Sequence, residues 1–483
     1  MEPEVGTAYG QVRGEKHPGV TVFRGIPYAR PPVGDRRFMA PEPPDRWDGV
    51  RDATSFGPPV PQAGRGTDPA GSDWLTLNIW TPDTADGTVP VFTWIHGGAY
   101  RGGASSDAIY EGSTLAGLGM VVVTLNYRLG VEGFAQLDGA PANRGLLDVV
   151  AALRWVADNI TAFGGDPDNV TVAGESAGAG IVAALLAMPS ARGLFHKAVA
   201  SSVPGTFLST ELAADVAREI AVAAGVTEAS RKVFADLSPA TLSAAGDAVG
   251  ERLGEHPNWG RLAFTDTPYA PVVDGEVLPR TPWRALFDGE AHDIRLLTGH
   301  NRDEYRMMLS GMPTPPTEQD TAALLEAFAP SPAKFRFAYA ELSQPDLYER
   351  LYSDWLFRMP TLHLAQAHAV GGGTTYLYEL TIAAPAAPHA GACHGLDLPL
   401  VFGNPNPWLA GDQPGESFNA LGELMRSEWA SFVRTGAPGW DPYTAARRTT
   451  RVYDDPASAG SYPEHTSMHL WERHVFAGLP LLR

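Results

Sequence analysis

Runs of apolar, often β-branched residues recur along the chain and predict buried strands. Several of these runs are apolar on both faces, which is typical of parallel strands that helices cover on both sides. The six clearest runs are Val89–Ile95, Met120–Tyr127, Asn169–Gly174, Lys197–Ser202, Asp293–Gly299 and Thr374–Leu380.

Helical patterns lie between these strands. The segment Asn143–Ile160 carries apolar residues at steps of three and four, which places them on one helix face, and Gly164-Gly165 follows it as a helix stop signal. Alternation of strands and helices predicts an α/β fold whose mainly parallel central sheet is flanked by helices.

Three segments depart from this alternation. Up to about Thr81 the chain is rich in proline and glycine, and Asp86-Gly87 between two strand-like runs suggests an antiparallel pair at the sheet edge. Residues 206–260 and 310–370 are alanine-rich and helical, so we expect them to be insertions that form pocket walls over the active site. No long polar linker divides the chain, so residues 1–483 are expected to form a single domain.

Charge narrows the choice of partners. The 483 residues include 36 Lys and Arg against 55 Asp and Glu, a formal net charge of −19. Such a surface repels phosphate backbones and makes nucleic acid a poor partner. No run of about 18 apolar residues predicts a membrane span. The sequence does not indicate an oligomeric state.

Cysteine usage and the N-terminal residues bear on the compartment. Cys393 is the only cysteine, so an intrachain disulfide is impossible. That fits a reducing compartment, or a secreted protein that manages without disulfides. Met1–Gly10 shows neither the basic nor the apolar region of a signal peptide. We therefore expect a cytoplasmic protein, and we expect Cys393 to be a small packing residue.

The segment Gly174–Gly178 contains the strongest chemical motif, Gly-Glu-Ser-Ala-Gly. It follows a predicted strand and opens a helix-like run of small residues. Strand, turn and helix around G-x-S-x-G predict a sharp turn that presents Ser176 as a nucleophile, with Glu175 as a supporting neighbour. An ordinary turn with a solvent-facing serine is the alternative.

A second glycine-rich loop follows the strand that ends at Ile95. It reads His96-Gly97-Gly98-Ala99, and its glycines allow backbone N–H groups to approach a substrate oxygen closely. We expect an oxyanion hole formed by the amides of Gly98, Ala99 and Ala177, the last at a helix N-terminus. His96 is expected to brace the loop and not to take part in the chemistry.

A serine hydroxyl needs a base, and a histidine base needs a carboxylate to orient it. On this kind of scaffold the chain order is serine, acid, histidine. Asp303 and Glu304 both follow the strand that ends near Gly299. Sequence position alone leaves both carboxylates open as the acid.

The base is expected in the loop after the strand that ends at Leu380. His389 and His394 both lie there. His394 is the better candidate because Gly395 permits a tight turn and Asp397 can anchor the loop.

Together these motifs resemble the type-B carboxylesterase family, which includes bacterial p-nitrobenzyl-esterase-like enzymes and the cholinesterases. The resemblance covers nearly the whole chain, and its most specific block is Phe163–Pro167 followed by Gly174–Gly178. The other matching segments are Phe23–Ala29, Pro31–Gly34, Leu75–Pro82, Asn126–Gly130 and Gly133-Phe134.

The resemblance implies an α/β-hydrolase fold and decides between the open candidates. The family's acid is the glutamate of an N-x-D-E segment, which matches Glu304. Its base is the histidine of an H-G segment before V-F-G, which matches His394. Ser202 matches a second serine that braces the triad, although Val203 replaces the glycine that follows it in the family.

Two further departures from the family lie away from these residues. Trp74 stands where secreted members carry a disulfide cysteine, so no such loop is pinned in this chain. Val149 follows Asp148 where the family favours glutamine.

The implied activity is that of a serine carboxylic ester hydrolase that works through an acyl-enzyme and requires no cofactor or metal. Its partner would be a small-molecule ester with neutral, apolar acyl or aryl groups. A thioesterase or amidase using the same triad, or a non-catalytic adhesion-type member of the fold, are the alternatives. Candidate pocket residues are Trp259, Phe264, Tyr305, Met307, Met308, Phe402 and Trp408.

Overall fold

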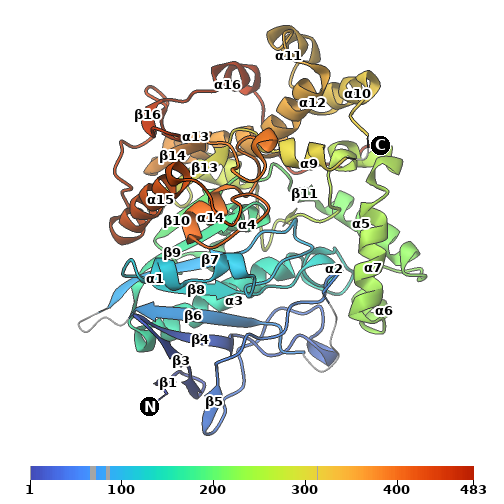
Figure 1. The fold of residues 1–483 in the computed structure, drawn as a ribbon. Coiled ribbons are helices and arrows are strands. Elements are labelled where there is room, and N and C mark those ends of the chain that lie inside the picture. The colour runs from blue at the N-terminus through green and yellow to red at the C-terminus, as the bar shows by residue number, and fades with distance from the viewer. Residues whose placement is uncertain (1, 66–71, 83–87, 313) are drawn as a thin grey trace. The chain divides into compact units, whose positions relative to one another are not determined.

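The structure is a computed structural model that describes residues 2–65, 72–82, 88–312 and 314–483 (Figure 1). The chain falls into two compact units. Unit 1 comprises Met1–Ala198, Thr206–Thr281 and Gly478–Arg483, and unit 2 comprises Val199–Gly205 and Pro282–Ala477.

The sheet of unit 1 has parallel strands in its interior and antiparallel strands at one edge. β7 (Val89–Ile95) pairs in parallel with β8 (Val121–Leu125) and β9 (Gly165–Glu175). All five residues of β8 are buried, as expected for a strand covered on both faces. Towards the edge the order continues through β6 (Thr76–Pro82), β4 (Val20–Pro27) and β3 (Glu15–His17), all antiparallel (Figure 1).

The antiparallel pair expected around Asp86-Gly87 is wrong as a pairing of β6 with β7. β6 pairs with β8 and β4, and the fully apolar β8 lies between β6 and β7. Asp86 and Gly87 themselves lie outside the described residues.

Helices of unit 1 cover this sheet. α3 (Arg144–Asn159) is amphipathic and buries Leu146, Val150 and Leu153, whereas every residue of α4 (Ala177–Ala187) is buried. α4 packs on β9 and β7, where its small side chains permit a close approach. The other helices of four or more residues are α1 (Ser113–Ala116), α2 (Gly130–Phe134), η3 (Ile160–Phe163), α5 (Thr210–Ala223), α6 (Arg231–Ala235), α7 (Pro239–Gly250) and η6 (Pro257–Phe264).

Short elements complete unit 1. A three-stranded sheet joins β1 (Glu4–Gly6), β2 (Gln11–Arg13) and β5 (Val50–Asp52), and β11 (Leu208–Ser209) pairs with β12 (Val272–Val273). The short 3-10 helices are η1 (Gly34–Arg36), η2 (Ala108–Tyr110), η4 (Pro189–Ala191) and η5 (Leu253–Glu255).

Unit 2 repeats the parallel arrangement. β13 (Arg295–Asn301) pairs in parallel with β14 (Thr375–Leu380), and β14 pairs in parallel with β15 (Thr449–Tyr453). β16 (Ser458–Ser461) is antiparallel to β15, and the end of β10 (Lys197–Ser201) lies next to β13. All six residues of β14 are buried.

Helices of unit 2 pack around these strands. α12 (Gln344–Ser353) continues through one π-helical turn, η7 (Asp354–Arg358), into the largely buried α13 (Met359–Val370). The remaining helices are α8 (Pro282–Phe287), α9 (Arg306–Ser310), α10 (Glu318–Phe328), α11 (Pro332–Ala338), η8 (Pro388–Ala390), α14 (Asp397–Phe402), α15 (Glu416–Thr435) and α16 (His465–Trp471).

The main elements expected from the sequence are therefore present. A strand coincides with each of the six apolar runs, and α3 begins and ends within one residue of the expected helix. Residues 206–260 and 310–370 contain helices, as expected. Within the described ranges, none of the helices has both the length and the apolar character that crossing a bilayer demands.

Candidate active site

Ser176 lies in unit 1 on the turn between β9 and α4. Its backbone has φ 56° and ψ −125°, a conformation that non-glycine residues rarely adopt. The strand on one side and the helix on the other hold it there, and Gly180 N donates to Ser176 O at 3.0 Å. Strain of this kind at a partly exposed serine is typical of a functional turn.

Glycines, which have no Cβ atom, make this turn possible. A Cβ added to Gly174 would lie 2.5 Å from the Gly178 carbonyl carbon, and one on Gly178 would lie 2.1 Å from Ile95 O. A Cβ on Gly97 would lie 3.2 Å from the Cβ of Ser176. The glycine-rich loop therefore passes directly against the serine turn, as close as two backbones can pack.

That loop presents backbone N–H groups. Gly98 and Ala99 have φ 110° and 53°, and the amides of Arg101 and Gly102 both donate back to Gly98 O. Within the described part of the chain, no hydrogen bond from the amides of Gly98, Ala99 and Ala177 is found. Ala177 is also the first residue of α4, where the helix dipole favours negative charge.

His96 braces the loop in a neutral form. Its Nδ1 lies 2.8 Å from Gly97 O, its ring stacks on Tyr127 with centroids 4.6 Å apart, and the Tyr127 hydroxyl donates to His96 O. Burial lowers the pKa of His96 to about 4. An uncharged, fully packed ring can hold the loop but is poorly suited to exchanging protons near neutral pH.

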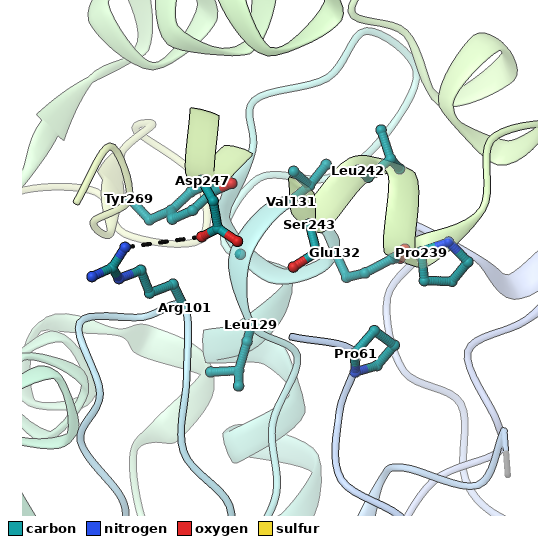
Figure 2. A pocket seen from close by; sticks show the side chains of 11 residues that line it. Pro61, Arg101, Leu129, Val131, Glu132, Pro239, Leu242, Ser243, Asp247 and Tyr269 are labelled. Atoms are coloured by element: carbon teal, nitrogen blue, oxygen red, sulfur yellow. Dashed lines mark ion pairs between the residues drawn. The ribbon is translucent and has the colours of Figure 1, made fainter. Parts of the chain in front are cut away.

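A pocket lies beside the same loop in unit 1 (Figure 2). Arg101 reaches from the loop towards Asp247 on α7, with 3.9 Å between the charged atoms. Glu132, a second acid of the pocket, is bound by Arg37 at 2.6 Å. Within the lining, only Arg101 and Asp247 pair with each other, because Arg37 lies outside it. The remaining residues of the lining are Pro61, Leu129, Val131, Pro239 and Leu242, with Gly130, Ser243 and Tyr269.

In unit 2, Glu304 follows the end of β13 and is fully buried. Its Oε1 accepts hydrogen bonds from Ser202 Oγ at 2.5 Å and from Asn301 N at 2.8 Å. Its Oε2 lies 2.6 Å from His394 Nδ1. Three donors therefore fix both oxygens of one buried carboxylate.

The His394 imidazole is oriented by this carboxylate. Because Nδ1 donates to Glu304, Nε2 is the nitrogen left for accepting a proton. His394 N also donates to Glu304 O at 3.2 Å, and the ring stacks on Phe357 with centroids 4.2 Å apart. The side chain is 14% exposed, so the imidazole is held firmly but is not sealed off.

The two alternative candidates occupy different positions. Asp303 Oδ2 accepts from Ala392 N at 3.0 Å, and Oδ1 pairs with Arg306 at 3.0 Å, so this carboxylate ties two loops together. His389 is exposed on η8. The structure brings Glu304 and His394 together and leaves Asp303 and His389 out of that contact.

Ser202 also has an unusual backbone. Its φ is 56°, it is fully buried, and its amide donates to Gly299 O at 2.7 Å. This geometry aims its hydroxyl at Glu304. Asn301 is a second clamp that the sequence reasoning missed: its side chain donates to Cys393 O at 2.7 Å. Its place in the N-x-D-E segment was the available signal.

Glu175 and Cys393 flank the two groups. Glu175 is 4% exposed in unit 1, with its Oε2 2.9 Å from where a Gly97 Cβ would lie. Cys393 is buried in unit 2, and burial raises the pKa of its thiol to about 12. The thiol therefore stays protonated, which excludes it as a nucleophile near neutral pH.

The seven expected pocket residues are placed in varied surroundings. Trp259 is buried in unit 1, where its Nε1 donates to Asp215, and Tyr305 stacks on Tyr352 in unit 2. Phe402 is fully buried, and Trp408 is 85% exposed. Phe264, Met307 and Met308 are half-buried.

Within the described residues, no cluster of three or more His, Cys, Asp or Glu side chains is arranged to hold a metal ion. The candidate site thus consists of a strained serine beside the amides of Gly98, Ala99 and Ala177 in unit 1, and of a carboxylate–imidazole pair in unit 2.

Comparison with known proteins gives consistent matches. A family model described as "Carboxylesterase family" matches residues 1–471. The para-nitrobenzyl esterase of Bacillus subtilis (strain 168) is 37% identical over 95% of this chain and 96% of its own. The fumonisin B1 esterase of Sphingopyxis macrogoltabida is 34% identical over 87% and 79%. The solved structure of the Geobacillus stearothermophilus carboxylesterase EST55 superposes with a TM-score of 0.86 at 37% identity, covering 97% of this chain and 99% of that one.

Proposed function

The chain belongs to the carboxylesterase family, has the α/β-hydrolase fold and is a carboxylic ester hydrolase, and on that premise we propose that Ser176, His394 and Glu304 form its catalytic triad. The observation that carries the proposal is the carboxylate–imidazole pair, in which Glu304 Oε2 holds His394 Nδ1 at 2.6 Å. That bond fixes the tautomer whose Nε2 can accept a proton from a serine.

The proposed reaction follows the acyl-enzyme route. His394 takes the Ser176 proton as Oγ attacks the ester carbonyl carbon, and it returns that proton to the departing alcohol. Water then attacks the acyl-enzyme with the same base, which releases the acid and restores the serine. Glu304 holds the ring through Nδ1 and stabilises the imidazolium during both steps.

The amides of Gly98, Ala99 and Ala177 are proposed to bind the oxyanion that forms at the carbonyl. Their support is the turn geometry, which leaves these three N–H groups without an internal acceptor. Preorganised donors of this kind each lower the free-energy barrier of the reaction by roughly 3–4 kcal/mol. Glu175 and Ser202 are proposed as supporting residues for the serine and the acid.

The substrate is proposed to be a neutral, apolar acyl or aryl ester. Beside the glycine-rich loop, Pro61, Leu129, Val131, Pro239 and Leu242 supply apolar side chains (Figure 2), which favour uncharged groups. The segments 206–260 and 310–370 are proposed to supply further pocket walls within a single catalytic domain. Of the seven expected pocket residues, Phe264, Tyr305, Met307 and Met308 remain candidates, whereas Trp259 and Phe402 are fully buried and Trp408 is 85% exposed. Two relatives in the comparison are named as esterases of para-nitrobenzyl and fumonisin B1 substrates.

A substrate panel tests this function. Initial rates are measured on p-nitrophenyl acetate and butyrate, on matched thioesters and on p-nitroanilides, with Ser176→Ala as the control. We expect the oxyesters to be fastest and Ser176→Ala to lose roughly 10⁴-fold or more while it remains folded. Faster thioester or anilide cleavage would favour a thioesterase or amidase, and near-normal turnover by Ser176→Ala would contradict the assignment of the nucleophile.

A further inference from the structure

Two consecutive serines at the end of β10 begin two separate hydrogen-bonded chains in unit 2. Ser202 bonds to Glu304, and Glu304 bonds to His394. Ser201 Oγ lies 2.7 Å from the Tyr378 hydroxyl, which in turn lies 3.2 Å from Asp397 Oδ2. The first chain belongs to the proposed triad, and the second has no role in it so far.

The residues of the second hydrogen-bonded chain, Ser201, Tyr378 and Asp397, are all buried. Ser201 and Tyr378 are fully buried, and Asp397 is 1% exposed. The Tyr378 ring lies flat against Gly299 of β13, where an added Cβ would be 2.3 Å from the ring. Asp397 Oδ1 has no hydrogen-bond partner among the described residues. One oxygen of a buried acid is therefore left without compensation, which is costly unless it serves a purpose.

Both hydrogen-bonded chains end at residues of the same short turn. His394 and Asp397 are three residues apart, and the turn between them is closed by Leu396 N donating to Cys393 O and Leu398 N donating to Gly395 O, both at 3.2 Å. Gly395 has φ 76°, which a glycine adopts without strain. The imidazole and the second carboxyl are thus positioned by the same backbone.

The electrostatic surroundings of Asp397 are those of the triad. Burial raises the pKa of Asp397 to about 6, Glu304 adds to the increase, and His394 opposes it. Tyr378 and Cys393 also face this carboxyl, and burial keeps both of them neutral. The helix that packs on α14 is α15, and it contributes the cation Arg426, whose guanidinium donates to Leu400 O at 2.8 Å.

We propose that Asp397 is a positioning residue for the reaction, whose ionised carboxylate adds a second buried negative charge beside His394 and stabilises the imidazolium that forms when Ser176 loses its proton. The Tyr378 hydroxyl is the donor in both contacts, to Ser201 Oγ at 2.7 Å and to Asp397 Oδ2 at 3.2 Å, and this sharing holds the carboxylate in place. The inference rests on the proposed triad and goes beyond it, because it assigns a second acid to the same base.

The test is the pH dependence of Asp397→Asn on p-nitrophenyl acetate. Asparagine keeps the size and removes the charge, so we expect kcat to fall about threefold to tenfold with KM unchanged. The acid limb of the kcat/KM profile should move down by about one pH unit, because an imidazolium with one carboxylate instead of two loses its proton more easily.

Thermal stability supplies the readout that separates charge from structure. The pKa of Asp397 in the folded state lies above its ordinary value. The free energy of unfolding of the wild type should therefore fall as pH rises from about 4 to about 6, and it should stay at the lower value above that range. Asp397→Asn should therefore have a higher Tm than the wild type at pH 8 and no advantage at pH 4.

Two further variants complete the design. Asp412→Asn removes an exposed charge from unit 2 and should leave the kinetics and the pH profile unchanged. Tyr378→Phe removes the donor but keeps the carboxyl, and it should lower kcat less than Asp397→Asn while shifting the acid limb in the same direction.

The outcomes are distinguishable. An unchanged pH profile in Asp397→Asn, or a lower kcat accompanied by a lower Tm at pH 8, would overturn the inference and leave Asp397 as an ordinary helix-end residue. An inactive wild type, or an active Ser176→Ala, would instead overturn the proposed function on which the inference rests.

Discussion

Two regions of the molecule hold the residues of the proposed triad, and different interactions build them. The nucleophile region consists of β9, Ser176, α4 and the loop at residues 96–102, and contacts between backbones shape it. The acid–base region consists of the ends of β10 and β13 and residues 391–402, and buried side-chain hydrogen bonds shape it. The first region depends on the absence of Cβ atoms at its glycines, and the second depends on the position of buried charged groups.

This difference determines how each region responds to change. Backbone amides neither titrate nor reorient when the pH changes, so the nucleophile region should be sensitive to added atoms and insensitive to charge. Buried carboxylates titrate, so the acid–base region should be sensitive to a change of charge at constant size. The predictions below follow from this contrast.

The largest expected effect is on the acid–base region. Glu304→Gln keeps the shape of the side chain but removes the charge that fixes the His394 tautomer. We expect kcat on p-nitrophenyl acetate to fall roughly 10³–10⁴-fold with the far-UV circular dichroism unchanged.

Asp303→Asn is the matched control for that variant. Asp303 binds Arg306 and Ala392 N and does not contact His394, so its loss should lower Tm more than kcat. If Asp303→Asn lost more activity than Glu304→Gln, the choice of the acid would be wrong.

The next effect tests the nucleophile region with a single methyl group. Gly178→Ala would place a Cβ 2.1 Å from Ile95 O, a backbone atom that cannot move aside. We expect the free energy of unfolding to fall by about 3 kcal/mol and activity to be lost, although alanine is the better helix former.

Gly117→Ala is the control for Gly178→Ala in the same unit. Its Cβ would lie an ordinary 3.4 Å from Ser113 O, and its backbone is helical, so stability should change by about 1 kcal/mol or less. Equal effects from both substitutions would mean that helix propensity and not the close backbone approach determines the outcome.

A smaller effect is expected from Ser202→Ala. It removes one of three donors to Glu304 and leaves the charge in place, so kcat should fall about tenfold. Ser201→Ala leaves that hydrogen bond intact and should cost less activity. Steady-state kinetics at pH 8 compare the two variants. A greater loss of kcat in Ser201→Ala would mean that the hydrogen bonds of Ser201 matter more to catalysis than the bond from Ser202 to Glu304, which contradicts the proposal.

The smallest effect concerns a buried acid away from the imidazole. Burial, with Glu464 adding to it, raises the pKa of Glu379 to about 8, and neither of its oxygens has a hydrogen-bond partner among the described residues. Wild-type stability should therefore fall as pH rises from about 4.5 to about 8.

Glu379→Gln removes that penalty. Its Tm should exceed the wild-type value by about 3 °C at pH 9 and match it at pH 4, with kcat unchanged. Differential scanning calorimetry at the two pH values checks this. A Tm loss at pH 9 would show that the carboxylate is stabilising and that its surroundings have been misread.

The same contrast explains what could be predicted from the sequence. Backbone-built features leave local signals, so Gly174–Gly178 and the loop at residues 96–99 could be placed on a strand end and a turn before any coordinates. The six strands were predictable for a similar reason, because their burial on both faces appears as uninterrupted apolar runs.

Features built from distant side chains leave no local signal. Asp303 and Glu304 are adjacent, and only the direction of their side chains separates the acid from a loop tie; family resemblance, not spacing, made that choice. The links of Asn301 to Cys393 and of Tyr378 to Asp397 were missed for the same reason. The β6 pairing failed because strand order depends on which strand inserts between two others, and here β8 does.

The most direct test of the central claim, that Ser176, His394 and Glu304 act as one unit, is covalent labelling with a fluorophosphonate probe followed by peptide mapping. The label should appear on the peptide that contains Ser176, and the labelling rate should fall at least a hundredfold, an order-of-magnitude expectation for loss of the general base, in folded His394→Ala. Labelling of another residue, or labelling of Ser176 in His394→Ala at the wild-type rate, would contradict the account.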